Sequence, residues 1–178
     1  IEINPNLAFT FELLEMPIAV SVGFGYVMGN VELKKYLDVF SPAPYLKLKG
    51  DGNSTTYNFG FFIQPLKSLK IGASYRHNID MEFKGDLTYD NIQGVEPLFQ
   101  ATTGSTKIKF PNDLRIGVAY NLMTDLWLEL GINYVGWSSY DTLAIHFEKG
   151  PGNPSAPYTS SQPRLYKNVI IYRLSAEY

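Results

Sequence analysis

The sequence predicts an all-β protein, an antiparallel transmembrane up-and-down β-barrel, and this prediction rests on three observations. Apolar residues recur at spacing two along most of the chain, which is typical of strands. Several of these alternating runs are much longer than the ~5–6 residues usual in soluble sheets. The connections alternate between short turns and long loops, as in outer-membrane barrels with short periplasmic turns and long outer loops. Because alternation alone does not say which face is wet, a soluble β-sandwich with an apolar inner face is the alternative.

The composition narrows the class of protein. The chain has 178 residues and a formal net charge of −2, so it is long enough for one domain with a sizeable core and has no general attraction to nucleic acid. It contains no cysteine, and its 13 tyrosines and 11 phenylalanines fit the aromatic-rich composition of outer-membrane barrels. No apolar run approaches the ~18 residues that a membrane-spanning helix requires. Any crossing of a membrane is therefore expected to use strands.

The first third of the chain predicts three strands. Alternating apolar residues mark residues 7–13 and then 18–37, with the short turn EMP between them. The alternation slips near Gly29–Asn30, where we expect a β-bulge. The next alternating strand covers 57–64, and 38–54, which contains several Pro and Gly residues, is expected to be a loop.

The stretch LKIGASYRHNIDMEFK, residues 69–84, shows the alternation most clearly. Every second residue from Leu69 to Phe83 is apolar except His77, and the residues between them are polar or glycine. In a wide membrane barrel the apolar row faces lipid and the polar row lines the lumen. We therefore expect a lipid-facing set on neighbouring strands that includes Ile71, Tyr75, Ile116, Val118, Leu128 and Ile132.

The remaining strands are expected at 106–121, 126–147 and 167–178, and the remaining long loops at 90–104 and 148–163. Pro111 cannot donate a hydrogen bond to a strand ladder, so we expect a kink or bulge there. The total is about seven strands, with the ends of the chain on opposite sides of the membrane. Since closed bacterial barrels have an even number of strands, this count predicts part of a barrel.

Three stretches carry a resemblance to one family: NFGFFIQPLKSLKIGASYRHNIDMEFKGD, FPNDLRIGVAYNLMTDLWLELGINYVGWSSYDTL and NVIIYRLSAEY. The first contains a Gly-x-Ser-Tyr-Arg strand that ends in Gly-Asp. The second contains a Gly-x-Ala-Tyr strand followed by Gly-Trp-Ser. In this order the segments resemble the FadL/TodX family of outer-membrane transporters for long-chain fatty acids and aromatic hydrocarbons. GYVMGNVELKKYL matches more loosely, and together the four segments cover most of the chain.

The resemblance implies a 14-stranded barrel in the bacterial outer membrane, with an N-terminal hatch in the lumen and passive uptake of hydrophobic compounds without a cofactor or catalysis. Residues 1–178 are then expected to be a partial outer-membrane barrel domain of about half the strands, without the hatch and the C-terminal strands. The expected partners are a hydrophobic small molecule, outer-membrane lipid, and the rest of the barrel with its hatch, but no nucleic acid. The alternative is a structural or adhesive outer-membrane barrel whose long loops bind partners.

The candidate site residues are cations on the polar rows. A fatty acid has a carboxylate head, and an Arg or Lys in a low-dielectric passage would hold it. By alternation, four cations share the face predicted to line the lumen: Arg76, Lys84, Arg115 and Arg173. The alternative is that these cations pair across strands, as structural ladders, with Asp80, Glu82, Asp113, Glu129 and Glu177.

The other chemically suggestive residues point to no catalytic or metal site. His77 and His146 have no Cys or HExxH-like spacing around them, whereas a metal site requires several convergent ligands. A hydrolase interpretation would use Ser138, Ser139, Asp141 and His146, but nothing local marks an activated nucleophile. Gly23, Gly25 and Gly29 precede no helix and so form no phosphate loop. They indicate either close backbone approach in a strand or a constriction in the barrel wall.

Overall fold

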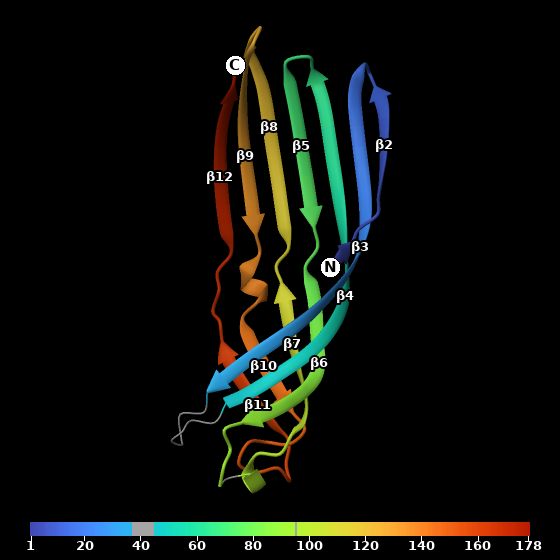
Figure 1. The fold of residues 1–178 in the computed structure, drawn as a ribbon. Helices are drawn as coiled ribbons and strands as arrows, with labels where there is room; N and C mark the ends of the chain where they lie inside the picture. The colour runs from blue at the N-terminus through green and yellow to red at the C-terminus, as the bar shows by residue number, and fades with distance from the viewer. Residues whose placement is uncertain (37–44, 95) are drawn as a thin grey trace.

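The computed structural model describes residues 1–36, 45–94 and 96–178, which form one antiparallel sheet of twelve strands (Figure 1). The strands are β1 (Glu2–Ile3), β2 (Asn6–Leu13), β3 (Met16–Tyr36), β4 (Tyr45–Leu66), β5 (Leu69–Arg76), β6 (Ile79–Asp90), β7 (Thr102–Phe110), β8 (Asp113–Met123), β9 (Leu126–Val135), β10 (Thr142–Phe147), β11 (Tyr158–Pro163) and β12 (Val169–Glu177). Two single-turn 3-10 helices are η1 (Glu96–Leu98) and η2 (Trp137–Ser139). The described part of the chain contains no helix with the length and hydropathy of a membrane span.

Ten of the strands form five longer runs, each made of two consecutive strands with a short break between them. The two strands of a run pair with the same neighbouring run in the sheet. β5 and β6, for example, both pair with β4. Five such pairs together with β3 and β4 give seven runs in the described residues, and the number of separate strands, twelve, differs from the predicted count of about seven because the short breaks divide these runs. The breaks fall at residues 4–5, 77–78, 111–112, 136–141 and 164–168, so the predicted interruption at Pro111 is confirmed. Figure 1 shows them at a common level, which we call the waist.

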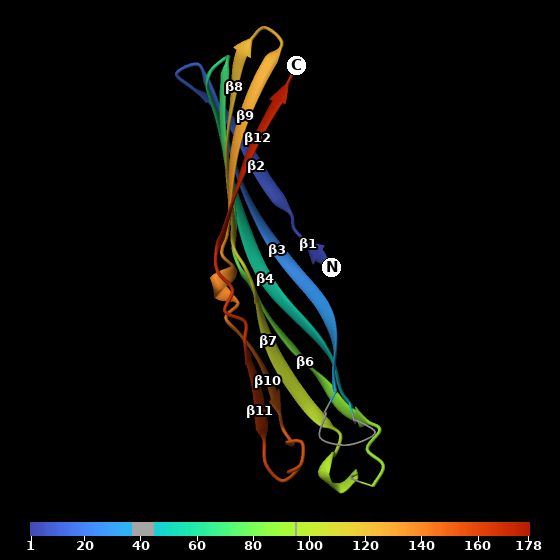
Figure 2. The same cartoon turned by 90° about the vertical axis from the view of Figure 1, so that its left-hand side faces the viewer.

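The waist divides the sheet into two halves. The turn-end half finishes in the short turns Leu14–Glu15, Lys67–Ser68 and Thr124–Asp125, and the loop-end half carries the longer connections. Figure 2 shows the turn-end half as a thin layer and the loop-end half spread out, as a curled sheet appears from the side. Residues from strands near opposite edges of the loop-end half, β3 with β4 and β10 with β11, line one cavity. We call the face that encloses this cavity the inner face, and the opposite face the outer face.

In the turn-end half the outer face is apolar from one edge of the sheet to the other. Three rows of directly opposed residues cross all seven runs, and the middle row is Phe9, Val20, Phe61, Ala73, Ile116, Ile132 and Tyr172. Most of these side chains are exposed, which a soluble sheet would not tolerate over such an area. The set predicted to face lipid shares this outer face, as Ile71 opposite Val118 and Ile116 opposite Ile132 illustrate.

At the waist the run formed by β5 and β6 changes which face its residues point to. Asn53 and Asn58 are five positions apart on β4, whereas their partners Glu82 and Arg76 are six positions apart. One extra residue therefore lies at the break 77–78, and a one-residue slip moves every later side chain to the other face. The apolar row predicted from Leu69 to Phe83 is consequently wrong beyond His77: Met81 and Phe83 are buried on the inner face.

β3 crosses the waist without any slip. Its register against β4 is unbroken from Ile18 to Tyr36, so the bulge predicted at Gly29–Asn30 is wrong. What changes is the composition of each face, because Tyr26 and Met28 on the outer face give way to Glu32 and further polar residues. The break in the apolar alternation near Gly29 thus marks the point where the outer face changes from apolar to polar, and the strand itself stays regular.

The loop-end half has a hydrophobic core on the inner face, formed by Leu46, Leu48, Leu87 and Phe147. Residues 45–54, predicted to be loop, belong to β4, and the rest of that loop, 38–44, lies outside the described residues. Glycine here permits close approach within a strand, because Gly50 and Gly85 are directly paired and a Cβ on Gly85 would overlap the main chain of Lys49. Likewise, β11 occupies the end of the predicted loop 148–163.

Aromatic side chains gather on the outer face near the waist. The His77 ring stacks on Tyr57 with centroids 4.3 Å apart, and its Nδ1 lies 3.1 Å from the Tyr75 hydroxyl. Tyr166 contacts Trp137 and Tyr140, with ring centroids 5.8 Å apart in each pair. Belts of Trp and Tyr are typical of membrane–water boundaries.

Beyond the waist the outer face is charged. The Glu32 carboxylate lies 3.5 Å from Lys34 Nζ, 3.2 Å from Lys47 Nζ and 3.6 Å from Lys49 Nζ. The hydrogen bond from Lys47 is the main reason that the pKa of the Glu32 carboxyl lies below its usual range. The outer face therefore changes from apolar to charged across the aromatic belt.

We expect Phe59→Arg to destabilise the intact protein by about 2–4 kcal/mol, because a guanidinium would replace an apolar side chain within the bilayer. Asn53→Arg is the matched control, since Asn53 lies on the same face of the same strand but beyond the waist. Urea unfolding in phospholipid vesicles measures both effects. Equal costs for the two variants would mean that the bilayer does not end at the waist.

We expect Gly85→Ala to destabilise the protein by about 1–3 kcal/mol, because its methyl group would overlap the Lys49 carbonyl and force β4 and β6 apart. Gly72→Ala is the control, since the nearest atom to a Cβ there is 3.8 Å away. The same unfolding assay compares them, and a neutral Gly85→Ala would show that the two strands can separate freely.

Candidate functional site

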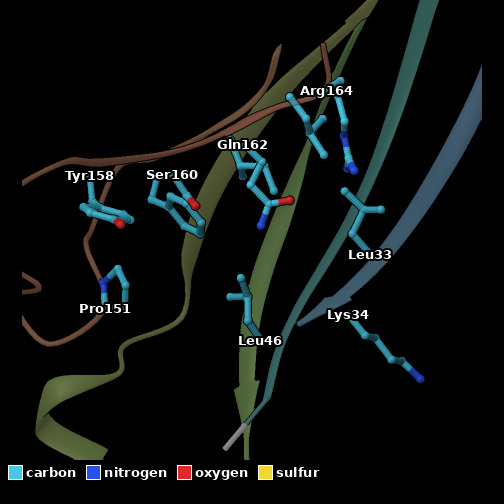
Figure 3. Close-up of a pocket in the computed structure, with 11 residues that line it drawn as sticks. Leu33, Lys34, Leu46, Pro151, Tyr158, Ser160, Gln162 and Arg164 are labelled. Atoms are coloured by element: carbon cyan, nitrogen blue, oxygen red, sulfur yellow. The ribbon is translucent and has the colours of Figure 1, made fainter. Parts of the chain in front are cut away.

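An apolar cavity lies on the inner face of the loop-end half (Figure 3). Its volume is about 280 Å³. Its apolar wall comes from β3, β4, β10 and β11 and includes Leu33, Leu46, Leu143, Ile145, Phe147 and Tyr158. These residues meet because the sheet curls, which brings β3 toward β11 although four strands separate them in the sheet order.

One side of this cavity is polar. Ser160 and Gln162 alternate along β11 with residues of the other face, and Arg164 follows directly after the strand. The Arg164 main chain is fixed, because its N–H donates to the Asp141 carbonyl at 2.6 Å. Figure 3 shows the Arg164 side chain extending toward Leu33 and the Gln162 side chain extending toward Leu46 in that view.

A cluster of amides and one ion pair lies on the inner face at the waist, and we call it the collar. Arg76 forms an ion pair with Glu2 on β1. Asn58 donates a hydrogen bond to Asn6 Oδ1 at 2.6 Å and accepts one from Asn4 at 3.0 Å. The collar joins β1, β2, β4 and β5 across four runs, so it both fixes the waist and presents polar atoms inside.

Two glycines of β3 make room for the collar. A Cβ on Gly23 would overlap the side chains of Asn6 and Asn58, and a Cβ on Gly25 would meet Thr56 and then Glu2. The atoms that approach these two glycines are side-chain atoms of the collar and of Thr56, rather than the main chain of a neighbouring strand.

Between the collar and the turns, the inner face carries mostly small residues. Gly72, Gly117 and Gly131 are direct partners on neighbouring strands, and Ser21, Gly60 and Ser74 form the next row. Larger polar groups return near the turns, where Lys70 Nζ lies 4.2 Å from the centre of the Trp127 ring. From the loops to the turns, the inner face thus carries apolar residues, then polar residues at the collar, then small residues, and then polar residues again.

The structure brings Arg76, Arg115 and Arg173 to the inner face of the turn-end half but places Lys84 on the outer face. The prediction that Lys84 shares the lumen face with Arg76 is wrong, because the slip at 77–78 inverts β6. Lys84 Nζ lies 3.1 Å from the carboxylate of Glu82 on the same strand.

The predicted cross-strand pairing is realised only in part. Arg115 Nε donates to Asp113 Oδ1 at 2.7 Å, within one strand rather than across strands. Asp80 contacts Lys109 on the neighbouring β7, with 3.7 Å between Lys109 Nζ and the carboxylate. Arg173 has no ion pair among the described residues and lies beside Gly131.

The Ser and His residues considered for hydrolysis make other contacts. His146 Nδ1 lies 2.8 Å from the Thr159 hydroxyl, and the Ser139 hydroxyl donates to the Gly136 carbonyl at 2.9 Å. Within the described ranges, no group of three or more His, Asp or Glu side chains is arranged to hold a metal ion.

Sequence reasoning missed the collar amides and the polar side of the cavity. The sequence does not single out Asn4 and Asn6, because a short polar residue in a strand does not by itself indicate a hydrogen-bonded cluster. Gln162 was assigned to a loop because of the surrounding Ser and Pro residues, although Tyr158, Ser160 and Gln162 do recur at spacing two.

The family model for outer membrane protein transport proteins (OMPP1/FadL/TodX) matches residues 1–178, the whole chain. The chain belongs to this family. Its place is therefore the bacterial outer membrane, and the outer face of the turn-end half is the surface suited to that membrane. No curated protein resembles the chain closely enough to count as a match.

Solved structures of the same family share the fold. The chain is similar to a Pseudomonas aeruginosa FadL homologue, with a TM-score of 0.69 and 18% identity over 98% of this chain and 45% of that one. It is similar to the Pseudomonas putida toluene transporter TodX, with a TM-score of 0.60 and 14% identity over 98% of this chain and 50% of that one. The CymD monoaromatic hydrocarbon channel gives a TM-score of 0.65 and 16% identity over 99% and 55% of the two chains. The chain therefore spans about half the length of these relatives.

Proposed function

We propose that this chain forms part of the wall of an outer-membrane channel for passive uptake of hydrophobic small molecules, such as long-chain fatty acids or aromatic hydrocarbons. The observation that carries the proposal is the exchange of faces at the waist. Apolar side chains cover the outer face on the turn side of the waist and line an inner cavity on the loop side. A purely structural barrel has no need of an apolar inner surface on the solvent side of the membrane.

The proposed passage begins at the apolar cavity and continues past the collar along the small-residue part of the inner face. Burial of apolar surface in the cavity favours capture from water by about 25 cal/mol per Å² of surface removed from water. The small residues beyond the collar leave room for the next part of the path. The toluene transporter and the monoaromatic channel among its structural relatives agree with apolar cargo.

The proposal assigns no chemical step and no cofactor to the chain. Direction of transport then follows the concentration gradient of the hydrophobic molecule. The complete passage also requires the remaining barrel strands and, by family resemblance, a hatch in the lumen. Lipid contact for the outer face of the turn-end half belongs to the same proposal.

We further propose that Arg76, Arg115 and Arg173 act on substrates with a carboxylate head. All three lie on the inner face on the turn side of the cavity, where a molecule that has left the cavity must pass. Arg76 and Arg115 already hold Glu2 and Asp113, so a substrate carboxylate would compete with those pairs.

Leu143→Trp tests the channel proposal. Leu143 is 7% exposed and lines the cavity, so an indole there would fill much of the space. We expect uptake of both octanoate and octane to fall several-fold in cells carrying the intact protein. Ile116→Trp on the outer face is the control, and folded protein is quantified by heat-modifiable gel migration. Unchanged uptake of both probes by Leu143→Trp would exclude the cavity from the passage.

Arg115→Gln tests the head-group role. Lys84→Gln is a matched control, because Lys84 also pairs with an acid two residues earlier on its strand but lies on the outer face. We expect Arg115→Gln to slow octanoate uptake and leave octane uptake unchanged, since a charge-assisted contact is worth ~1.5–3 kcal/mol. Equal loss for both probes would show a structural role, and no loss would remove Arg115 from the passage.

A further inference from the structure

We infer that the outer face of the loop-end half docks the phosphorylated glycolipid of the outer leaflet, through Lys34, Lys47 and Lys49 around Glu32. We call these four residues the lysine cluster. The outer leaflet of a bacterial outer membrane is built from a glycolipid whose phosphates lie between its acyl chains and its outer sugars. The inference rests on the proposed contact of the outer face with lipid and is independent of the passage on the inner face.

The first support is that cations are brought together on one part of the sheet. Lys34 and Lys47 are directly opposed in the ladder between β3 and β4, and Lys49 is opposed to Glu32. The Glu32 carboxylate lies 3.5, 3.2 and 3.6 Å from the three Nζ atoms, so three positive charges share one negative charge. Like charges directly opposite each other destabilise a sheet, and a bound polyanion would relieve that repulsion.

This excess of positive charge is local. On the same face, three other lysines each lie directly opposite a carboxylate, in the pairs Lys84–Asp51, Lys107–Glu82 and Lys109–Asp80. Lys49 is likewise opposite a carboxylate on each side, Glu32 and Asp86. Lys47, by contrast, lies between Lys34 and a threonine. The row formed by Lys34 and Lys47 is therefore the centre of the cationic surface.

The second support is the height of the cluster above the apolar surface. Met28 is the last apolar side chain on the outer face of β3 before the charged part, and Glu32 and Lys34 lie four and six positions beyond it. A strand advances about 3.3 Å per residue and barrel strands tilt by about 40°, which places these side chains roughly 10–15 Å higher. Figure 1 shows β3 and β4 inclined in this half. Phospholipid headgroups extend only about 5–8 Å beyond the hydrocarbon, so this height fits the thicker headgroup of a glycolipid.

The third support is the order of side chains along the outer face. Beyond the row of Lys34 and Lys47, Tyr36 and Tyr45 are directly opposed, with ring centroids 5.7 Å apart. Tyr36 is 63% exposed, and a tyrosine ring offers an apolar face and a polar tip, which suits the C–H face of a sugar. From the membrane outward, the surface is apolar, then cationic, then aromatic. A glycolipid presents acyl chains, phosphates and sugars in the same order.

The cluster is accessible from the lipid side. The side chains of Lys34 and Lys49 are 53% and 60% exposed. Figure 3 shows the Lys34 side chain extending away from the labelled residues on the other side of the cavity. Ammonium groups bind phosphate oxygens, and lysines beside an anionic lipid surface are attracted to it. The phosphates of the lipid are therefore the groups that we assign to this surface.

Binding of fluorescently labelled lipopolysaccharide to the intact detergent-solubilised protein tests the inference, and the same lipid without its phosphates is the second probe. We expect Lys34→Gln/Lys47→Gln to weaken binding of the phosphorylated lipid about 10-fold, since two exposed ionic contacts are lost, and of the dephosphorylated lipid less than about 2-fold. Lys34→Arg/Lys47→Arg keeps both charges and should bind both lipids as the parent does. Lys107→Gln/Lys109→Gln removes the same charge from the outer face of β7 and is the matched control. Heat-modifiable gel migration verifies that each variant is folded.

Several outcomes would overturn the inference. Unchanged binding by Lys34→Gln/Lys47→Gln, or equal weakening of both lipids, would show that these lysines hold no phosphate. An equally large loss in Lys107→Gln/Lys109→Gln would reduce the effect to general charge attraction. Displacement of the lipid by inorganic phosphate, beyond that by sodium chloride of equal ionic strength, would assign the cluster to free phosphate. If the parent protein bound neither lipid, the proposed lipid contact of the outer face would fail as well, whereas the channel proposal is decided separately by Leu143→Trp.

Discussion

The main-chain hydrogen-bond ladder fixes the face of every side chain, and the rest of this structure depends on that constraint. A strand has two faces and its residues alternate between them wherever the ladder is regular, so a strand that passes from one environment to another must either change its composition or slip its register. The chain uses both solutions at the waist. β3 and β4 continue in register and change composition, whereas the run of β5 and β6 gains one residue at 77–78.

The same constraint explains why the inner surface is graded. In the turn-end half, apolar side chains occupy the outer face, so small and polar residues remain for the inner face. In the loop-end half the assignment is reversed, and the curled sheet gathers its apolar side chains around a cavity. The collar lies where the two assignments meet, and its amide hydrogen bonds and the Arg76–Glu2 pair connect β1, β2, β4 and β5, although Arg76 Nε is buried without a hydrogen-bond partner among the described residues. From the loops toward the turns, this face is first apolar, then polar at the collar, and then lined mostly by small residues.

Much of the fold could be predicted from the sequence, because alternation is a local property. The seven runs and the interruption at Pro111 follow from residue types alone. The reversal at His77 could not be predicted, since apolar residues continue at spacing two in the sequence while the main chain slips beneath them. The prediction of a loop at residues 45–54 is wrong because glycines within a bent strand and glycines in a turn look alike in a sequence. The place of Arg164 beside the cavity could not be predicted, because it depends on the curl of the sheet that brings β11 toward β3.

The slip at 77–78 has a consequence for how such chains can change length. The neighbouring run is interrupted at 111–112, and the register between the two runs is the same on both sides, with Arg76 opposite Asp113 and Ile79 opposite Phe110. The two runs therefore carry matching extra residues. Insertion or deletion of two residues in a run at the waist would leave the faces of its later residues unchanged, whereas a single residue would turn the later part of that run inside out. A matching single residue in the neighbouring run would keep the two runs paired but would invert both, so only even steps lengthen or shorten this wall without exchanging its faces.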